Sequence, residues 1–324
     1  MRALVAGATG FIGRHLVRCL GEAGYEVRAL ARPTSDGSVL SDLKVEVRRG
    51  SIGDKDFLKS AVSGVDLVYN LIGQIGGWGV SKRDLQEANV TAVGLLLAAC
   101  QDADVNRFVH CSTPGVVGMS GVASESLPCN PCGQYELSKL EGETIALGFG
   151  AEKRLSVAVA RPDFVYGPGD LHKLKLFRAV KNRRFPLIGG GISLLHPTYI
   201  DDVVNGLLLV GQHPAACGEV FNLAGPGPVS VSYLVRCITR RLKCELPRLR
   251  VPTLAAKSAA AISEWGATLT RTDPLLTRYQ VKFFTLDHAS DISKARTVLG
   301  YEPQVSVEQG VDRTVRWYQD NKLL

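Results

Sequence analysis

The chain has 324 residues, of which 45% are hydrophobic and 21% charged, and its formal net charge is +7. This length allows one large domain or two unequal ones, and the composition excludes a disordered chain. The apolar run from Ala3 to Ala6 comes almost at once, which does not fit a secretion signal, and no run reaches the roughly 18 to 20 apolar residues of a membrane span. We expect a cytoplasmic protein with no membrane span.

Basic residues are spread along the chain, except for a cluster in residues 173–185, and no nucleic-acid motif accompanies them. We therefore expect the positive charge to serve an anionic cofactor or substrate and not nucleic acid. The eight cysteines are scattered among apolar neighbours. Cys129 and Cys132 lack a second ligand pair, so we expect no metal site.

Apolar runs with strand character alternate with helical stretches through the first half of the chain. The expected strands are residues 2–7, 26–31, 44–50, 66–73, 107–113 and 156–162. Helices are expected at about 11–23 and 83–102, and over the segment that carries Tyr135. Strands that are apolar on both faces and separated by helices predict a doubly wound, parallel α/β sheet of the Rossmann type.

The composition of the sequence changes after residues 161–170. Loops rich in glycine and proline and basic helices follow. We expect a dinucleotide-binding domain in residues 1–165, with residues 200–225 packing back onto it. Residues 166–199 and 226–324 would form a smaller substrate-binding region on the carboxyl edge of the sheet.

A glycine-rich turn, GATGFIG, follows the first expected strand and opens the first helix. Gly7, Gly10 and Gly13 let the backbone turn sharply and approach a pyrophosphate, whose charge is favoured at the amino end of a helix. A turn without a ligand is the alternative.

The residue type at the end of the second strand indicates the cofactor. A carboxylate there would bind the adenosine ribose of NAD, but the chain has Arg32, and a guanidinium suits a 2'-phosphate. Arg14 would add a second positive charge. We expect NADP(H) in preference to NAD(H), with a solvated loop position as the alternative for Arg32.

Tyr135 and Lys139 lie four residues apart in GQYELSK. A tyrosine with the usual pKa of about 10 is a poor base at neutral pH. A lysine ammonium one turn away, together with the cationic ring of an oxidised cofactor, would lower that pKa and let the tyrosine act as general acid and base. In isolation the spacing also fits an exposed ion-pair position on a helix.

With GATGFIG, YELSK and RPDFVYGPGD in this order, the chain resembles an extended short-chain dehydrogenase/reductase of the NAD-dependent epimerase/dehydratase family over nearly its whole length. The resemblance implies that Thr113, Tyr135 and Lys139 are catalytic, with Ser112 competing with Thr113 for its role. It also implies a set of residues along the cofactor: Gly7, Thr9, Gly10, Phe11, Ile12, Gly13, Arg32, Ser51, Ile52, Leu71, Ile72, Gly73, Asn89, Tyr135, Lys139, Pro162 and Val165.

Nucleotide-sugar enzymes of the family commonly have an arginine where this chain has Leu195, and LTRYQV and DISKA near the end resemble the 3β-hydroxysteroid dehydrogenase-like branch. We therefore expect an oxidoreductase that moves a hydride between nicotinamide and a hydroxyl or ketone carbon of a small or largely apolar substrate. The alternatives are a nucleotide-sugar epimerase or dehydratase with tightly bound NAD, and a protein that senses NAD(P) without turnover.

Three further residues are candidate substrate contacts: Trp78, His172 and His196. Ordinary packing for the tryptophan and structural positions for the histidines are the alternatives. The resemblance also implies a homodimer packed through the helices near residues 83–102 and 135–150.

Overall fold

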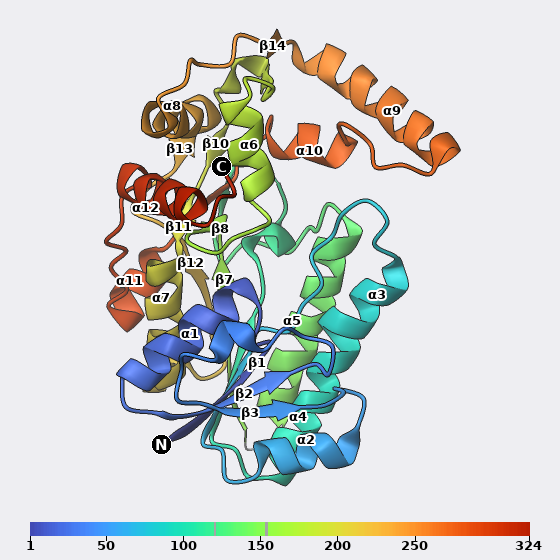
Figure 1. The fold of residues 1–324 in the computed structure, drawn as a ribbon. Helices are drawn as coiled ribbons and strands as arrows, with labels where there is room; N and C mark the ends of the chain where they lie inside the picture. The colour runs from blue at the N-terminus through green and yellow to red at the C-terminus, as the bar shows by residue number, and fades with distance from the viewer. Residues whose placement is uncertain (120, 153–154) are drawn as a thin grey trace.

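The computed structural model describes residues 1–119, 121–152 and 155–324, and its centre is a seven-stranded parallel sheet with the order β12-β7-β5-β4-β1-β2-β3 (Figure 1). These strands are β1 Arg2–Ala6, β2 Glu26–Ala31, β3 Glu46–Arg49, β4 Leu67–Asn70, β5 Arg107–Cys111, β7 Ser156–Pro162 and β12 Val220–Leu223. The order reverses between β1 and β4, and ligands bind at such a switch point in open α/β sheets.

Each face of the sheet is covered by its own layer of helices, because the strands are apolar on both sides. In β1, Ala3 and Val5 belong to one hydrophobic core, whereas Leu4 and Ala6 belong to the other. The first core includes α1 (Phe11–Glu22) and α7 (Ile200–Gln212), and the second includes α2 (Lys55–Val62), α4 (Ala92–Asp102) and α5 (Gln134–Glu152). The expected doubly wound α/β fold is therefore confirmed.

The helix expected at about 83–102 is interrupted. It consists of α3 (Lys82–Gln86), a π-helical segment over Glu87–Thr91, and α4. A π-helical turn inserts one extra residue and is often found at functional sites. Here it carries Asn89, whose side chain is fully buried.

The remaining elements gather mainly beyond the carboxyl edge of the sheet, above it in Figure 1. The helices are α6 Leu174–Lys181, α8 Val231–Leu242, α9 Thr253–Thr270, α10 Arg278–Phe283, α11 Ser293–Leu299 and α12 Val307–Asp320. Short strand pairs join distant segments: β8 Val165–Tyr166 with β11 Thr198–Tyr199, β9 Leu187–Ile188 with β14 Arg250–Val251, β10 Leu194–Leu195 with β13 Val229–Ser230, and β6 Val122–Ala123 with β15 Ala289–Ser290. Short 3-10 turns cover Ser38–Leu40, Pro114–Val117, Gly189–Gly191 and Pro214–Ala216.

Residues 200–225 lie against the sheet, because α7 packs beside α1 and β12 is hydrogen-bonded to β7. The division of the chain into two functional regions stays a prediction.

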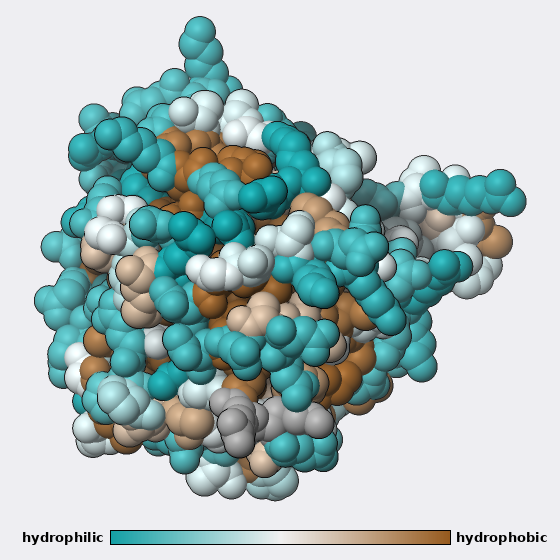
Figure 2. Space-filling model, turned by 90° about the horizontal axis from the view of Figure 1, so that it is seen from below, coloured by the Kyte–Doolittle hydropathy of each residue, from teal (hydrophilic) through white to brown (hydrophobic). Residues whose placement is uncertain are grey.

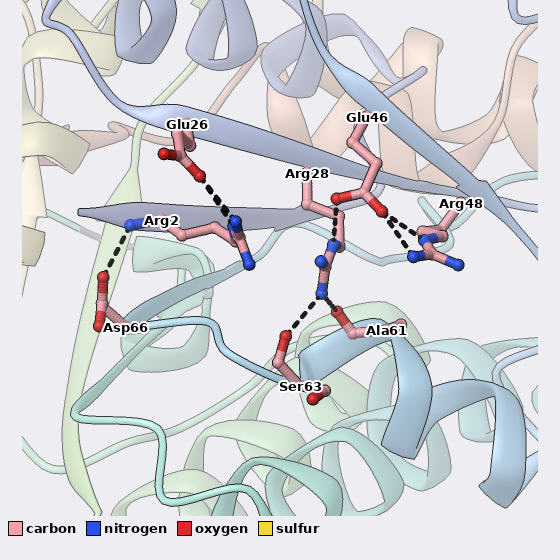
Figure 3. A network of polar contacts seen from close by, with 8 residues as sticks. All are labelled: Arg2, Glu26, Arg28, Glu46, Arg48, Ala61, Ser63 and Asp66. Carbon is pink, nitrogen blue, oxygen red and sulfur yellow. Dashed lines mark hydrogen bonds and ion pairs between the residues drawn. The ribbon is translucent and has the colours of Figure 1, made fainter.

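Polar contacts away from the carboxyl edge join β1 to β2, and separate ones join β2 to β3 and to the end of α2 (Figure 3). The guanidinium of Arg28, which is 5% exposed, donates to Glu46 Oε2 at 2.8 Å and to the carbonyls of Ala61 and Ser63 at 2.6 and 2.9 Å. Glu46 also pairs with Arg48 at 2.6 Å. A buried arginine is tolerated when its donors are satisfied in this way.

Seen from below, the surface carries hydrophilic side chains with separate hydrophobic areas between them (Figure 2). Within residues 1–119, 121–152 and 155–324, no helix has both the length and the apolar character that crossing a bilayer requires.

Candidate functional site

The glycine turn between β1 and α1 is built for close approach of backbone to backbone. Gly7 has φ +84°, and a Cβ on it would lie 2.9 Å from the carbonyl of Leu71, which follows β4. A Cβ on Gly13 would collide with the carbonyl oxygen of Gly7. The turn thus depends on glycine at both positions, which seats the amino end of α1 directly on the switch point of the sheet.

The amino end of α1 fits a pyrophosphate. Gly10 is its N-cap and offers no side-chain cap, and the first turn of α1 contains no acidic residue. The first N–H groups of a helix lack intrahelical acceptors and carry a partial positive charge, so an anion is their natural partner. Thr9, Phe11 and Ile12 in this turn are half-buried.

Two arginines gather where the adenosine end of a dinucleotide would lie. Arg32 is exposed directly after β2, and its side chain has no hydrogen-bond partner among the residues that the structure describes. Arg49 ends β3, pairs in register with Ala31, and donates from Nη1 to the carbonyl of Ser35 at 2.9 Å. Sequence reasoning missed Arg49, because only the strand register brings it beside the loop that follows β2.

The other residues that were expected near the adenosine end are either uncharged or bonded to another part of the protein. Ser51 is exposed and its Oγ accepts from Gly53 N at 3.2 Å, while Ile52 packs against the second core. Arg14, the second positive charge that the sequence suggested, donates from its guanidinium to the carbonyl of Pro168 at 3.4 Å and packs against Gly169, and its role toward a cofactor stays a prediction.

Lys139 lies inside the protein, 4% exposed, and its Nζ donates to the carbonyl of Cys111 at 2.6 Å. Cys111 ends β5, so this bond fixes α5 to the carboxyl edge of the sheet. Burial lowers the pKa of Lys139, and the Cys111 thiol and the Glu143 carboxylate oppose the shift. Nζ also lies close to Gly73, within 3.8 Å of where a Cβ on that glycine would stand.

Tyr135 is half-buried, and the loop after β4 covers its base, since a Cβ on Gly76 would come within 2.7 Å of the tyrosine Cβ. Burial raises the pKa of the phenol, and Cys111 and Glu136 add to the rise. The lowering of this pKa by Lys139 together with the cationic ring of an oxidised cofactor stays a prediction. A raised pKa favours the protonated phenol, the form that gives up a proton.

Thr113 and Ser112 follow β5 with different hydrogen bonding. Thr113 Oγ1 accepts from Gly115 N at 3.3 Å as the N-cap of the turn Pro114–Val117, which leaves its O–H free to donate. Ser112 is 6% exposed, and its Oγ has no partner within the described part of the chain. Both hydroxyls thus retain donor capacity.

Asn89 connects the loop after β4 to α5. Its Oδ1 accepts from Gln74 N at 2.8 Å, and its Nδ2 donates to Gln74 O at 3.0 Å and to Ser138 Oγ at 2.8 Å. Both amide hydrogens are therefore used within the protein. The position fits a residue that holds Leu71, Ile72 and Gly73 in place beside Lys139.

The segment after β7 supplies a polar and an aromatic wall. Pro162 is buried at the end of β7 and Val165 begins β8. Asp163 between them accepts from Ser290 Oγ at 2.6 Å, and burial raises its pKa to about 7. Phe164 stacks on Phe283 of α10 with ring centroids 5.9 Å apart.

The aromatic wall continues to the helix that carries Tyr135. Tyr279 stacks on Phe283 at 6.4 Å, and its hydroxyl donates at 2.9 Å to Glu136 Oε1. Glu136 is 2% exposed and directly follows Tyr135. The sequence contained no signal for this contact, because its two residues are 143 positions apart.

The three candidate substrate residues are placed differently. Trp78 is 42% exposed in the loop after β4, and His172 is exposed after Gly169-Asp170. His196 is 3% exposed, and its ring nitrogens are occupied by the carbonyl of Gly225 at 3.0 Å and the N–H of Ser290 at 3.2 Å. It joins two segments of the protein, in line with the structural alternative. Across the described ranges, no group of three or more His, Cys, Asp or Glu is placed to hold a metal.

The chain is similar to known proteins over most of its length. The model of the NAD dependent epimerase/dehydratase family matches residues 3–224. A ketoreductase of Stigmatella aurantiaca, named for 4-hydroxy-2-methyl-3-oxo-4-farnesyl-3,4-dihydroquinoline-1-oxide, is 29% identical over 96% of this chain and 95% of its own. The 2-alkyl-3-oxoalkanoate reductase of Stenotrophomonas maltophilia (strain K279a) is 30% identical over 97% and 98%.

More distant relatives include both functional classes considered. The 3 beta-hydroxysteroid dehydrogenase/Delta 5-->4-isomerase of Mycobacterium tuberculosis (strain ATCC 25618 / H37Rv) is 28% identical over 98% of this chain and 90% of its own. The solved structure of DesIV, a dTDP-glucose 4,6-dehydratase from Streptomyces venezuelae with NAD bound, matches with a TM-score of 0.81 and 28% identity over 99% and 98% of the two chains. The chain is thus an enzyme of the extended short-chain dehydrogenase/reductase type, and it belongs to the NAD-dependent epimerase/dehydratase family.

Proposed function

We propose that this enzyme is an NADP(H)-preferring oxidoreductase that interconverts a ketone and a secondary alcohol on a largely apolar substrate. The observation that carries the proposal is the meeting of Tyr135, Lys139 and the residues after β5 at one edge of the sheet, beside the glycine turn. Bound nicotinamide supplies or accepts the hydride.

In the reductive direction, the protonated phenol of Tyr135 donates its proton to the substrate oxygen as negative charge develops there. The Thr113 hydroxyl, or that of Ser112, donates a hydrogen bond to the same oxygen and fixes its position. Lys139 keeps a positive charge next to the tyrosine, which stabilises the phenolate that forms, and offers its remaining N–H donors to the cofactor ribose.

An apolar substrate is supported by the lining of the site. Phe164, Phe283 and Tyr279 form a stacked aromatic wall beside the catalytic helix. Leu195, at the position where nucleotide-sugar enzymes commonly have an arginine, is fully buried in the core. Three relatives are also named for compounds with large apolar parts: a farnesylated quinoline oxide, a 2-alkyl-3-oxoalkanoate and a steroid.

The replacement Tyr135→Phe tests the mechanism. It should lower kcat for NADPH-dependent reduction of 2-alkyl-3-oxo acids or 3-ketosteroids by about 10²- to 10⁴-fold, because it removes the acid and keeps the ring. Tyr25→Phe, a tyrosine that bonds Gln212 at 3.0 Å, is the matched control and should leave kcat unchanged. Unaltered turnover in the Tyr135 variant would refute the proposed acid.

The preference for NADP(H) rests on the two arginines at the adenosine end. Arg32 and Arg49 together present guanidinium groups to a 2'-phosphate. Both carboxylates of the intervening loop are already bonded, because Asp36 accepts from Ser38 N at 2.9 Å and Asp42 pairs with Arg18 at 3.1 Å. Arg32→Ala and Arg49→Ala should each weaken NADPH binding by about 10-fold and NADH binding much less.

Arg48→Ala provides the control for that experiment, since Arg48 precedes Arg49 in β3 but pairs with Glu46. Equal losses of NADPH and NADH affinity in the Arg32 and Arg49 variants, measured by fluorescence titration, would remove the argument for NADP.

A nucleotide-sugar epimerase or dehydratase is the second candidate, favoured by the similarity to DesIV. Such an enzyme reduces and reoxidises its NAD within one cycle, whereas a dehydrogenase exchanges it. Purification with stoichiometric, tightly held NAD would therefore favour the second candidate. The presence of Thr113, Tyr135 and Lys139 argues against a sensing protein without turnover.

The homodimer through α4 and α5 and the cytoplasmic location are part of the proposal. Ile145 on α5 is 37% exposed, and Leu95 on α4 is half-buried, so both helices offer apolar side chains to a second copy. Light scattering of the purified chain would measure the mass.

A further inference from the structure

Helix α9 has two apolar faces, and only one of them is covered. On the inner face, Ala256 and Ala260 pack with Val281 of α10 and Ile188 of β9 in a small separate core. The outer face carries large apolar side chains that are mostly exposed: Leu254 at 78%, Ile262 at 69%, Trp265 at 68% and Leu269 at 64%. Their spacing of eight, three and four residues forms one stripe along the helix.

Further exposed apolar residues flank α9 in the chain. Leu275, in the loop between α9 and α10, is 98% exposed, and Leu246 and Leu249 before α9 are 47% and 53% exposed. Figure 1 shows α9 as an arm that stands away from the sheet. An exposed apolar stripe along a helix marks a binding surface, whereas single exposed apolar residues need no explanation.

The surroundings of the stripe are basic. Residues 245–282 contain six Lys or Arg and three Asp or Glu. Glu245 bonds both Arg183 and Arg248, and Glu264 bonds Arg278, so two of the three acidic residues and two of the six cations are paired. The other four cations of this segment have no ion pair within the described part of the chain: Arg250, Lys257, Arg271 and Lys282. The parallel pairing of β14 with β9 also brings Arg250 beside the segment that follows exposed Arg183 and Arg184.

We propose that the outer face of α9 docks this enzyme reversibly on an anionic lipid membrane. The outer stripe holds leucine, isoleucine and a tryptophan, the only charged residues of α9 are Lys257 and Glu264, and arginines lie before and after the helix. This combination is typical of a helix that lies in a bilayer interface, where apolar side chains enter the acyl boundary and cations contact anionic headgroups. Because α9 protrudes from the body of the protein, its outer face could contact a broad, deformable surface such as a bilayer.

Docking would hold the aromatic wall of the site close to the lipid surface, one helix layer behind α9. The inner arm of the same hairpin, α10, carries Phe283 and Tyr279, and Tyr279 reaches Glu136 next to Tyr135. An apolar substrate dissolved in lipid would then enter beside α10. This consequence rests on the proposed function, whereas docking itself does not.

Vesicle sedimentation of the full chain tests the inference. The protein should pellet with vesicles of phosphatidylcholine and phosphatidylglycerol, at least about 10-fold less with phosphatidylcholine alone, and less as salt rises. The double variant Trp265→Gln/Leu269→Gln should lose at least about 10-fold in partitioning to anionic vesicles. Ile192→Gln/Leu171→Gln, which replaces residues 79% and 62% exposed elsewhere, is the matched control and should bind as the natural chain does.

Thermal unfolding of both double variants should match that of the natural chain, because substitutions of exposed side chains change stability little. Vesicle binding that is absent, equal for both lipid compositions, or equal in the two double variants would overturn the proposal. So would a lipid-free dimer, seen by light scattering, that Trp265→Gln/Leu269→Gln dissociates, because the stripe would then be an interface between copies. Failure of docking would leave NADPH-dependent reduction of a soluble ketone intact, so the proposed function is tested separately.

Discussion

Two regions of the molecule are held in place by different kinds of contact. One is the carboxyl edge of the sheet around Gly7, Gly13 and Lys139, called here the glycine edge, and the other is the hairpin formed by α9 and α10. At the glycine edge, Gly7, Gly13 and Lys139 approach neighbouring backbone so closely that no side-chain adjustment is available. The hairpin is joined to the body by a small core around Val281 and by the bond from Tyr279 to Glu136. The first region is suited to holding a cofactor in one geometry, and the second to adapting to substrates.

The largest effect should come from the tightly packed region. Gly13→Ala would push its methyl group into the carbonyl of Gly7, and overpacking of this kind costs about 1 to 3 kcal/mol. We expect dinucleotide affinity to fall by about 10- to 100-fold, measured by fluorescence titration. Gly21→Ala in the same helix, where a Cβ would meet nothing within 4 Å, should leave affinity unchanged. Equal affinities in the two variants would show that the turn is not tightly packed.

Sequence reasoning succeeded for the region whose parts are close together in the chain. The alternation of apolar strands and helices predicted the doubly wound sheet, and GATGFIG follows β1 because strand, turn and helix are contiguous. Arg49 and the pair Tyr279–Glu136 could not be found in this way. The first depends on the register of β3 with β2, and the second on how α10 folds back.

Local hydrogen bonding also escaped prediction. Asn89 fits the family pattern by position, but its role depends on a π-helical turn that the apolar periodicity of residues 83–102 conceals. Likewise, the pKa of Tyr135 depends on its burial under the loop at Gly76, which no motif expresses. Motifs identify the residues of such a site, whereas packing determines their hydrogen bonds and their pKa values.

A smaller effect is expected where the hairpin meets the catalytic helix. Tyr279→Phe removes the hydrogen bond to buried Glu136, which costs about 1 to 3 kcal/mol when a buried acceptor is left unsatisfied. We expect faster hydrogen exchange in α10 and a kcat/KM about 5- to 10-fold lower, with dinucleotide affinity unchanged. Tyr233→Phe, which breaks a bond to Glu308 between α8 and α12, should change none of these quantities. If dinucleotide affinity also fell in the Tyr279 variant, the two regions would not be independent.

The smallest effect concerns Asp163, which lies where the two regions meet. Burial raises its pKa from 3.8 to about 7, so between these values the folded protein binds a proton that the unfolded chain does not. Stability should therefore fall as pH rises through this window, by at most about 1.4 kcal/mol per pH unit.

Asp163→Asn removes that dependence, so the stability of the variant relative to the natural chain should increase from about pH 5 to about pH 8 in urea unfolding. Asp291→Asn is the control, because bonds from Ser293 lower the pKa of Asp291 and keep it ionised throughout this range. A relative stability that stays constant for both variants would mean that Asp163 is already charged at pH 5. In that case the boundary between the regions would be open to water, and the aromatic wall of Phe164 and Phe283 would not shield it.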